Sequence, residues 1–324
     1  MKSTTRYFLI LLALAAMILA GCSEDTGSPA AGGGKFATLR TYLINNDLDL
    51  PDVLSSWTIL VGDLNGNTGS YHIMDIRPQN VYDAGYIPGA VNVALADVVT
   101  EAGQAGGKPI VVVCKTGQEA GHAVMALRLS GYADAKVMKW GMSAWHSDFD
   151  LWTPNLGSVA VGDPNWVDGP ATAAVTFEYP DLVATATDGA GILAERVDAM
   201  LNDGFQVVLS GDVLETPGNY FINNYWLADD VTQYGIIDGA YRINPLDLES
   251  GEFMHYDPDE TAVTYCWSGQ TSSMVTAYLN ILGYDAESMK FGVNSLIYSE
   301  LTGHKFPGSA DYAYETTAPV LAVK

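Results

Sequence analysis

The sequence is poor in positive charge and in cysteine. Of 324 residues, 15 are Lys or Arg and 38 are Asp or Glu, so the formal net charge is −23. A chain this acidic repels nucleic acid, which excludes a nucleic-acid partner. Its three cysteines, Cys22, Cys114 and Cys266, are too few for a disulfide framework, and we expect no permanent bridge between the last two. CxxC motifs and clustered His/Cys spacings are also lacking, so we expect no metal site and no cofactor.

Residues 1–21 have the pattern of a secretory signal peptide. Lys2 and Arg6 precede an apolar run over residues 8–20, which is short for a membrane span. The run ends in Leu-Ala-Gly-Cys22, which resembles the bacterial lipobox and implies lipid attachment to Cys22. Ser23 follows, and the resemblance to Gram-negative lipoproteins then implies the bacterial cell envelope, with anchoring to the outer membrane. The alternative is an ordinary signal peptide with a chance cysteine.

The rest of the chain contains an internal repeat. Five motifs recur in order at an offset of 149 to 152 residues, which indicates one unit duplicated. The matching segments are 59–63 with 208–212, 70–73 with 219–222, 85–90 with 235–240, 114–118 with 266–270, and 139–141 with 290–292. Strand-like and helix-like runs alternate in each copy, which predicts an α/β fold with helices flanking each sheet.

The repeat and the composition together set the expected domain bounds. Small polar residues and glycines predict a flexible tether over 22–40. The two domains are expected at 41–152, beginning with a short helix within 41–54, and at 182–305, beginning with a helix over 190–201. A linker over 153–181 and a C-terminal tail over 306–324 complete the division, and the sequence leaves open where the tail packs.

Cys114 and Cys266 occupy equivalent loops. Each follows a strand-like run, 109–113 or 262–265, and precedes a helix-like run, 120–129 or 272–282. Backbone amides of such a loop converge on one point, and the helix dipole adds positive potential there. A thiol at that point is easier to ionise, and the thiolate is the nucleophile. We therefore predict that both cysteines are catalytic nucleophiles at the carboxyl ends of parallel strands.

The remaining loop residues are the candidates for contacting a substrate. In the first loop they are Lys115, Thr116, Gly117, Gln118 and Glu119, and in the second they are Trp267, Ser268, Gly269, Gln270 and Thr271.

These motifs resemble the rhodanese family. The first copy is similar to the family's N-terminal signature at 74–77 and 82–92, to its active loop at 113–117, and to its closing glycine-tryptophan element at 139–145. The resemblance implies two tandem rhodanese-like domains, each a mostly parallel sheet flanked by helices. It also implies a sulfurtransferase chemistry, in which a cysteine takes sulfur from a sulfane-sulfur donor, holds it as a persulfide, and passes it to a thiophilic acceptor.

Asp75 and Arg77 belong to the first signature. We interpret them as a supporting ion pair, with a direct catalytic role as the alternative. The second copy has Asn224 and Trp226 at the equivalent positions.

The loops depart from the family at their sixth position. The family usually has a cation there, whereas this chain has Glu119 and Thr271. An acid near Cys114 would raise the pKa of its thiol by about one unit, partly offset by Lys115. The alternative, which we favour, is that Glu119 faces solvent in the first helical turn. Cys266, surrounded by hydroxyl groups, is then expected to be the better-stabilised thiolate.

A related loop occurs in cysteine phosphatases, but it requires arginine six positions after the cysteine. Ala120 and Ser272 stand there. Without a guanidinium to hold phosphate, a phosphatase is excluded.

Two functions remain. The first is a lipid-anchored sulfurtransferase or persulfide carrier. The second is a non-catalytic docking lipoprotein of an outer-membrane electron-transfer or redox complex, with a multihaem cytochrome as a conceivable partner. Rhodanese-like lipoproteins occur beside bacterial electron-transfer assemblies, and the missing loop cations, the acidity and Trp267 support this second hypothesis.

Overall fold

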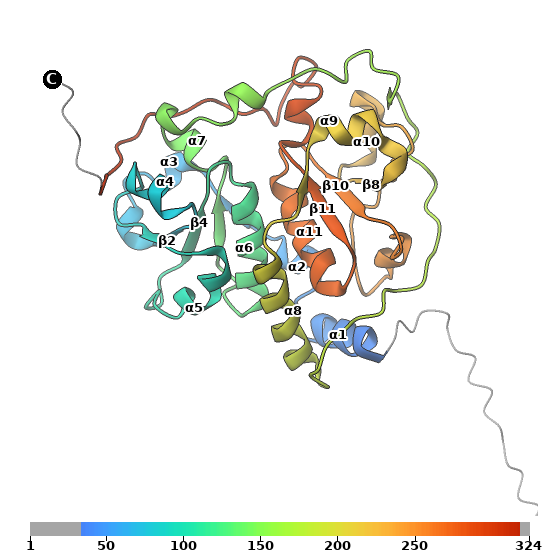
Figure 1. Ribbon diagram of the computed structural model, residues 1–324, viewed down its shortest axis with the longest axis horizontal. Helices are drawn as coiled ribbons and strands as arrows, with labels where there is room; N and C mark the ends of the chain where they lie inside the picture. Colours follow the sequence, from blue (N-terminus) through green and yellow to red (C-terminus); the bar gives the residue numbers. More distant parts are fainter. Residues whose placement is uncertain (1–33, 318–324) are drawn as a thin grey trace, which may run out of the picture.

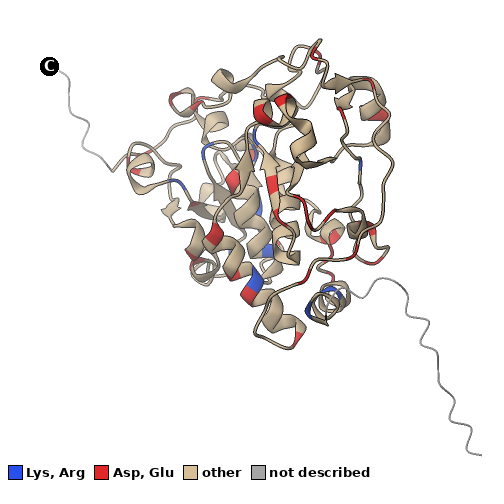
Figure 2. Cartoon of the chain, turned by 45° about the vertical axis from the view of Figure 1, so that its right-hand side comes forward, with Lys and Arg blue, Asp and Glu red and all other residues tan. Residues whose placement is uncertain are grey.

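A computed structural model describes residues 34–317 of the protein (Figure 1). The expected signal peptide, Cys22 and most of the expected tether lie outside the described residues. In the part that is described, no helix is long and apolar enough to cross a membrane. Acidic side chains are spread over many elements, while basic ones are few (Figure 2).

The first half of the structure, from β1 to α7, is built on a five-stranded parallel sheet in the order β1-β5-β4-β2-β3. The central strand β4 is a run of Ile and Val with every residue buried, as expected for a parallel strand covered on both faces. The strands are β1 Thr58–Ile59, β2 His72–Asp75, β3 Val91–Asn92, β4 Ile110–Val113 and β5 Lys136–Met138. The helices are α3 Val61–Leu64, α4 Gln79–Asp83, α5 Val98–Ala102, α6 Gln118–Leu129 and α7 Met142–Trp145.

The second half, from α8 to β11, has a four-stranded parallel sheet in the order β7-β11-β10-β8. This order corresponds to β1-β5-β4-β2 of the first half, so the equivalent strands occupy equivalent places. The strands are β7 Val207–Val208, β8 Phe221–Asn224, β10 Ala262–Tyr265 and β11 Ala286–Met289. The helices are α8 Gly189–Asp203, α9 Ser210–Glu215, α10 Ala228–Tyr234 and α11 Gln270–Leu282. The mixed α/β architecture predicted from the sequence, with parallel sheets flanked by helices, is confirmed.

The helices that follow the two cysteine loops pack against each other in the middle of the molecule (Figure 1). A Cβ atom on Gly121 of α6 would lie 2.1 Å from the Ser273 hydroxyl and 3.0 Å from the Gln270 carbonyl oxygen of α11, so glycine lets the two helices approach closely. One hydrophobic core contains residues of both halves, including Val112, Ala123 and Met274. The two cysteine loops are therefore brought together at one interface.

The N-terminal part differs from the expectation. Instead of one helix over 41–54, the chain forms α1 Gly34–Asn45 and α2 Leu50–Val53. Helix α1 contains the end of the expected tether, and it buries Phe36, Leu39 and Leu43 and packs on α8. The sequence did not predict α1, because the glycines beside residue 34 indicate a flexible segment. The apolar face of α1 is buried only by packing against α8.

The segments after each half are also packed. Within 153–181, β6 Trp166–Val167 pairs antiparallel with β9 Ile236–Ile237, so this segment contributes a strand and is more than a linker. The described part of the tail returns across the first half (Figure 1). Its backbone bonds there include Tyr312 N–H to Trp145 O at 3.0 Å and a bridge between Tyr86 and Glu315.

Candidate active site: two linked cysteine loops

Cys114 follows β4 directly, and its sulfur sits in a cradle of backbone amides. The N–H groups of Gly117 and Ala120 donate to Sγ at 3.1 and 3.4 Å. Gly117 has a φ of +81°, a conformation that turns the loop into α6 and that favours glycine. The geometry is the strand, loop and helix start that the sequence predicted.

Cys266 follows β10 in a similar loop, but its contacts are different. The N–H of Ser272 donates to Sγ at 3.4 Å, and the thiol lies 3.7 Å from the Ser272 hydroxyl as a donor. That hydroxyl is 2.9 Å from the hydroxyl of Ser288. Both cysteines are free thiols and are almost fully buried, with exposed fractions of 1% for Cys114 and 2% for Cys266.

Each loop is closed by an aromatic residue and a glycine from its own half. A Cβ atom on Gly141 would lie 2.5 Å from the Cys114 carbonyl oxygen, and one on Gly292 would lie 2.4 Å from the Cys266 carbonyl oxygen. Both glycines have positive φ, at 63° and 53°. The tight approach lets Met142 N–H bond to Cys114 O at 2.9 Å, which fixes the loop from behind.

Two glutamines connect each loop to the opposite half. Gln118 Oε1 accepts from the backbone N–H of Phe291 at 2.7 Å, and Gln270 Oε1 accepts from that of Trp140 at 2.8 Å. Both glutamine side chains are 1% exposed. Their amide groups also donate within their own loops, from Gln118 to Thr116 Oγ1 at 3.0 Å and from Gln270 to Ser268 Oγ at 3.1 Å. The repeated Gly-Gln pair marked both glutamines as loop residues. Nothing in the sequence indicated that their side chains bond to the opposite half.

A cavity of about 460 Å³ reaches Cys114, and both halves of the structure line it. Its wall residues from the first half are Cys114, Lys115, Thr116, Gln118, Glu119, Leu151 and Asn155, and those from the second are Phe205, Val207, Lys290 and Phe291. This volume suits a small-molecule ligand. Sequence reasoning missed the wall from the second half, because nothing in the repeat shows that one copy's closing element lies at the other copy's loop.

The electrostatics at Cys114 differ from the sequence expectation. Burial, and then the nearby charge of Glu119, raise the pKa of the Cys114 thiol to about 12, although the loop amides act in the opposite direction. The amide cradle was expected to favour the thiolate, but the loss of solvent outweighs it.

Glu119 does not simply face solvent. It is half-buried in the cavity wall, and burial raises the pKa of its carboxyl group while Lys115 and Lys290 oppose the rise. The Cys114 thiol and the Glu119 carboxyl group therefore both resist ionisation.

A smaller cavity of about 110 Å³ lies beside the second loop. Trp267, Ser268, Gln270 and Thr271 form one side, and Cys266 itself is not part of the wall. Trp267 is half-buried and stacks between Trp226 and His304, with ring centroids 4.1 and 4.5 Å apart. Packing therefore accounts for the position of Trp267.

Asp75 and Arg77 form a buried ion pair away from the cavity at Cys114. Arg77 Nη2 lies 2.6 Å from Asp75 Oδ2, and it also donates to Gly85 O at 2.6 Å. This geometry matches the supporting role expected from the sequence. In the second half, Asn224 and Trp226 are buried instead, and their side-chain polar atoms have no hydrogen-bond partner among the described residues.

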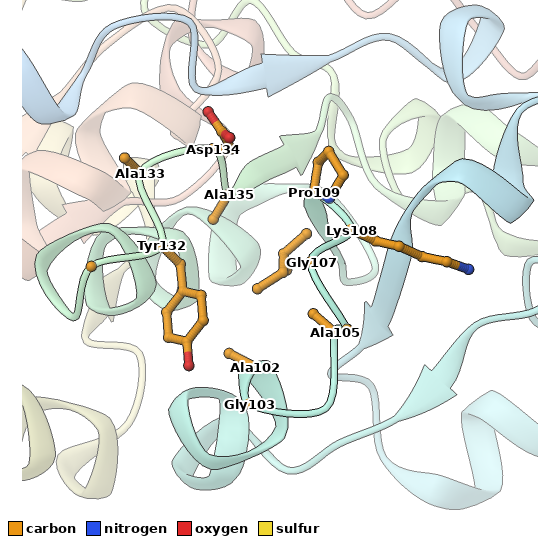
Figure 3. Close-up of a pocket in the computed structure, with 13 residues that line it drawn as sticks. Ala102, Gly103, Ala105, Gly107, Lys108, Pro109, Tyr132, Ala133, Asp134 and Ala135 are labelled. Carbon is orange, nitrogen blue, oxygen red and sulfur yellow. The ribbon is translucent and has the colours of Figure 1, made fainter.

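Another large cavity lies at the opposite end of the first sheet (Figure 3). It is lined mainly by small residues, with Lys108, Tyr132 and Asp134, and it contains no cysteine. Within residues 34–317, no group of three His, Cys, Asp or Glu side chains could hold a metal ion. Of the three cavities described, the one at Cys114 combines a cysteine in its wall with room for a ligand.

A comparison with models of protein families matches the part of the chain that contains the first cysteine loop. The family model described as "Rhodanese-like domain" matches residues 62–148. Thiosulfate sulfurtransferase GlpE of Shewanella oneidensis is 37% identical over 78 residues, which cover 24% of this chain and 77% of that protein. The adenylyltransferase and sulfurtransferase UBA4 of Meyerozyma guilliermondii is 30% identical over 102 residues, 28% of this chain. The match spans only 24% of that longer protein.

A solved thiosulfate sulfurtransferase from Pseudomonas aeruginosa matches over 79% of this chain and 45% of its own, at 12% identity and a TM-score of 0.29. The sequence match to the Shewanella enzyme covers most of that enzyme, and the residues matched by the family model include the loop of Cys114. Through residues 62–148, the chain belongs to the rhodanese-like family.

Proposed function

We propose that this protein is a sulfurtransferase or persulfide carrier in which Cys114 is the sulfur-bearing nucleophile. The observation that carries the proposal is the cavity of about 460 Å³ that reaches an amide-cradled thiol in a chain of this family. We further propose that the second half is a second rhodanese-like domain. Its parallel sheet and its loop at Cys266 support this, because they repeat the arrangement of the first half.

The proposed reaction needs no cofactor or oxidant. The Cys114 thiol releases its proton to solvent, and the thiolate attacks the terminal sulfur of a sulfane donor. A new S–S bond forms at Cys114 as the donor's own S–S bond breaks, and the donor's remainder leaves with the electron pair. An acceptor thiolate or other thiophile then attacks the outer sulfur of the persulfide, and the Cys114 thiolate is released. The loop amides stabilise the anionic sulfur at both stages.

The sequence favoured Cys266 as the better-stabilised thiolate. Access favours Cys114, because it lines the larger cavity and Cys266 is not part of the wall beside its loop. A sulfur-transfer assay with thiosulfate, polysulfide and an organic thiosulfonate on the variants Cys114→Ser and Cys266→Ser separates the two. We expect Cys114→Ser to abolish transfer and Cys266→Ser to retain it. The opposite result would move the nucleophile to Cys266.

One observation favours the second candidate function, a docking lipoprotein. The raised pKa of Cys114 keeps its thiol protonated at neutral pH, which suits a domain that has lost its chemistry. The variant that changes both cysteines to serine tests this. A docking protein would keep its partner and its cellular role without either thiol, whereas a sulfurtransferase would lose its role.

We also propose that Cys22 carries a lipid that anchors the protein to the outer membrane. The apolar run before Cys22 and the serine after it support this. Cells are grown with labelled lipid and then fractionated. We expect the wild-type protein to carry the label in the outer-membrane fraction and the Cys22→Ala variant to carry none. A labelled variant would contradict the proposal.

A further inference from the structure

We infer that Lys290, from the second half, supplies the cation that the loop at Cys114 lacks, and that the cavity selects organic monoanionic sulfane donors over thiosulfate. This inference rests on the proposed function and deepens it. The position of Lys290 in the wall places it at the site, and the lining of the cavity defines the class of donor.

The first argument is the position of the lysine. Lys290 and Phe291 form part of the same wall as Cys114, and Lys290 is close enough to influence the ionisation of Glu119. The structure records no ion pair within 4 Å between Lys290 and an acid of the described residues. Its ammonium group is therefore available to an anion that enters the cavity.

The second argument is that the backbone of Lys290 is held on both sides. The N–H of Lys290 donates to Val208 O at 2.9 Å, and the N–H of the next residue, Phe291, donates to Gln118 of the cysteine loop at 2.7 Å. The side chain then leans over the Phe291 ring, with Nζ 5.5 Å from the centroid. The hydrogen bond between Gln118 and Phe291 thus joins the loop of Cys114 to the residue that follows Lys290.

Lys115 is the alternative cation, since it also lies in the wall. However, Lys115 is exposed, whereas Lys290 is half-buried. On Glu119, Lys115 has the larger effect of the two. Solvent and salt screen an exposed charge more than a half-buried one, so we assign the attraction of a bound anion to Lys290, and the variant Lys115→Gln tests this assignment.

The third argument concerns the donor. The charged residues of the wall are Lys115, Lys290 and Glu119, so the cavity has a net charge of one positive unit when Glu119 is ionised. With one net positive charge, the wall leaves one of thiosulfate's two negative charges without a partner, and taking that unpaired charge out of water opposes binding. The uncharged part of the wall includes the apolar side chains of Leu151, Phe205, Val207 and Phe291. One net positive charge beside apolar surface fits a donor with one negative charge and an organic group, such as an organic thiosulfonate or a persulfide.

The reaction with a thiosulfonate is balanced without a further reagent. The Cys114 thiolate attacks the terminal sulfur of the thiosulfonate, the Cys–S–S bond forms, and the donor's S–S bond breaks. The sulfinate leaves with the electron pair, and its single negative charge remains beside Lys290.

The first arm of the experiment measures anion attraction without any sulfur transfer. Cys114 of the native full chain is alkylated with anionic iodoacetate and with neutral iodoacetamide, and the two rates are followed by peptide mass spectrometry. Lys290→Gln should lower the iodoacetate rate about fivefold relative to the iodoacetamide rate, which is the effect of one unit charge near contact in a water-like dielectric. The ratio of the two rates cancels any change in the ionisation of Cys114 itself. The matched control is Lys305→Gln, because Lys305 is also half-buried and leans over an aromatic ring, Tyr298, at 4.5 Å, but lies outside the cavity wall.

Three results of this arm would overturn the inference. The first is an unchanged ratio of the two rates in Lys290→Gln, and the second is an equal fall in Lys305→Gln. The third is a failure of both reagents to reach Cys114, because the cavity would then admit no small molecule. If Lys115→Gln reproduced the whole loss while Lys290→Gln did not, the loop would supply its own cation.

The second arm measures persulfide formation from benzenethiosulfonate and from thiosulfate. We expect the thiosulfonate to react faster, and Lys290→Gln to slow it. If neither donor modifies Cys114 while the alkylation rates still depend on Lys290, the proposed function fails and the anion site stands. If persulfide forms at the same rate in the wild type and in Lys290→Gln, or if thiosulfate is preferred, the function stands and this inference fails.

Discussion

The crossed glutamines make a quantitative prediction about how the two halves depend on each other. Gln118 accepts from Phe291 N–H across the interface and donates to Thr116 Oγ1, and all of these groups are buried. Substitution of Gln118 by leucine preserves much of the volume and removes both bonds. It leaves the Phe291 N–H, on a residue that is 7% exposed, without its acceptor.

The expected cost follows from those two losses. An unsatisfied buried donor costs about 1–3 kcal/mol, and the lost bond to Thr116 adds about 1 kcal/mol. We therefore expect Gln118→Leu to lower the free energy of unfolding by about 2–4 kcal/mol. Gln270→Leu removes the equivalent pair of bonds, to Trp140 N–H and Ser268 Oγ, and should cost a similar amount.

Urea unfolding followed by tryptophan fluorescence measures this cost. The matched control is Gln233→Leu in α10, where the side chain is exposed and the change should stay within about 0.5 kcal/mol. A loss below 1 kcal/mol in both Gln118→Leu and Gln270→Leu would refute the reasoning, because the crossed bonds would then contribute little to the interface.

Three further predictions concern single residues. Gly141→Ala should lower the free energy of unfolding, measured with urea, more than Gly66→Ala does. Both glycines have positive φ, but only a Cβ atom at 141 would meet a carbonyl oxygen, at 2.5 Å. Equal losses would show that the loop relaxes around the added methyl group. Burial lowers the pKa of His122 to about 4, so the stability that depends on its neutral form is complete above pH 6.5 and falls as pH drops toward 4, by up to about 3 kcal/mol. His122→Phe should flatten this part of the stability profile, and an unchanged profile would refute it. Glu119→Gln should lower the pKa of Cys114 and speed its alkylation at pH 8, whereas an unchanged rate would show that burial alone sets the pKa.

The sequence predicted those features that depend on local pattern. The Ile-Val run of β4 indicated a buried parallel strand, and helix α8 was expected over 190–201 and spans Gly189–Asp203. Gly131 and Gly283 follow α6 and α11, where glycine favours a left-handed conformation, and both have positive φ, at 96° and 99°. The structure of these residues could be predicted because it depends on their neighbours in the chain.

The site was harder to predict because it depends on contacts between distant segments. The amide cradle of Cys114 could be expected from strand, loop and helix, but its burial could not, since α6 lies against α11 only in the folded protein. Lys290 lies 176 positions from Cys114 and belongs to the other half. Periodicity and motifs predict the secondary structure of a segment and its place in its own sheet. They do not indicate which segment of the other half packs against it.

The central claim is that Cys114 bears sulfane sulfur, and peptide mass spectrometry after brief exposure to an organic thiosulfonate tests it most directly. The account predicts that the peptide containing Cys114 gains the mass of one sulfur atom, that excess thiol removes it, and that Cys114→Ser prevents it. An unmodified Cys114 after exposure to thiosulfonate, polysulfide and thiosulfate would contradict the account.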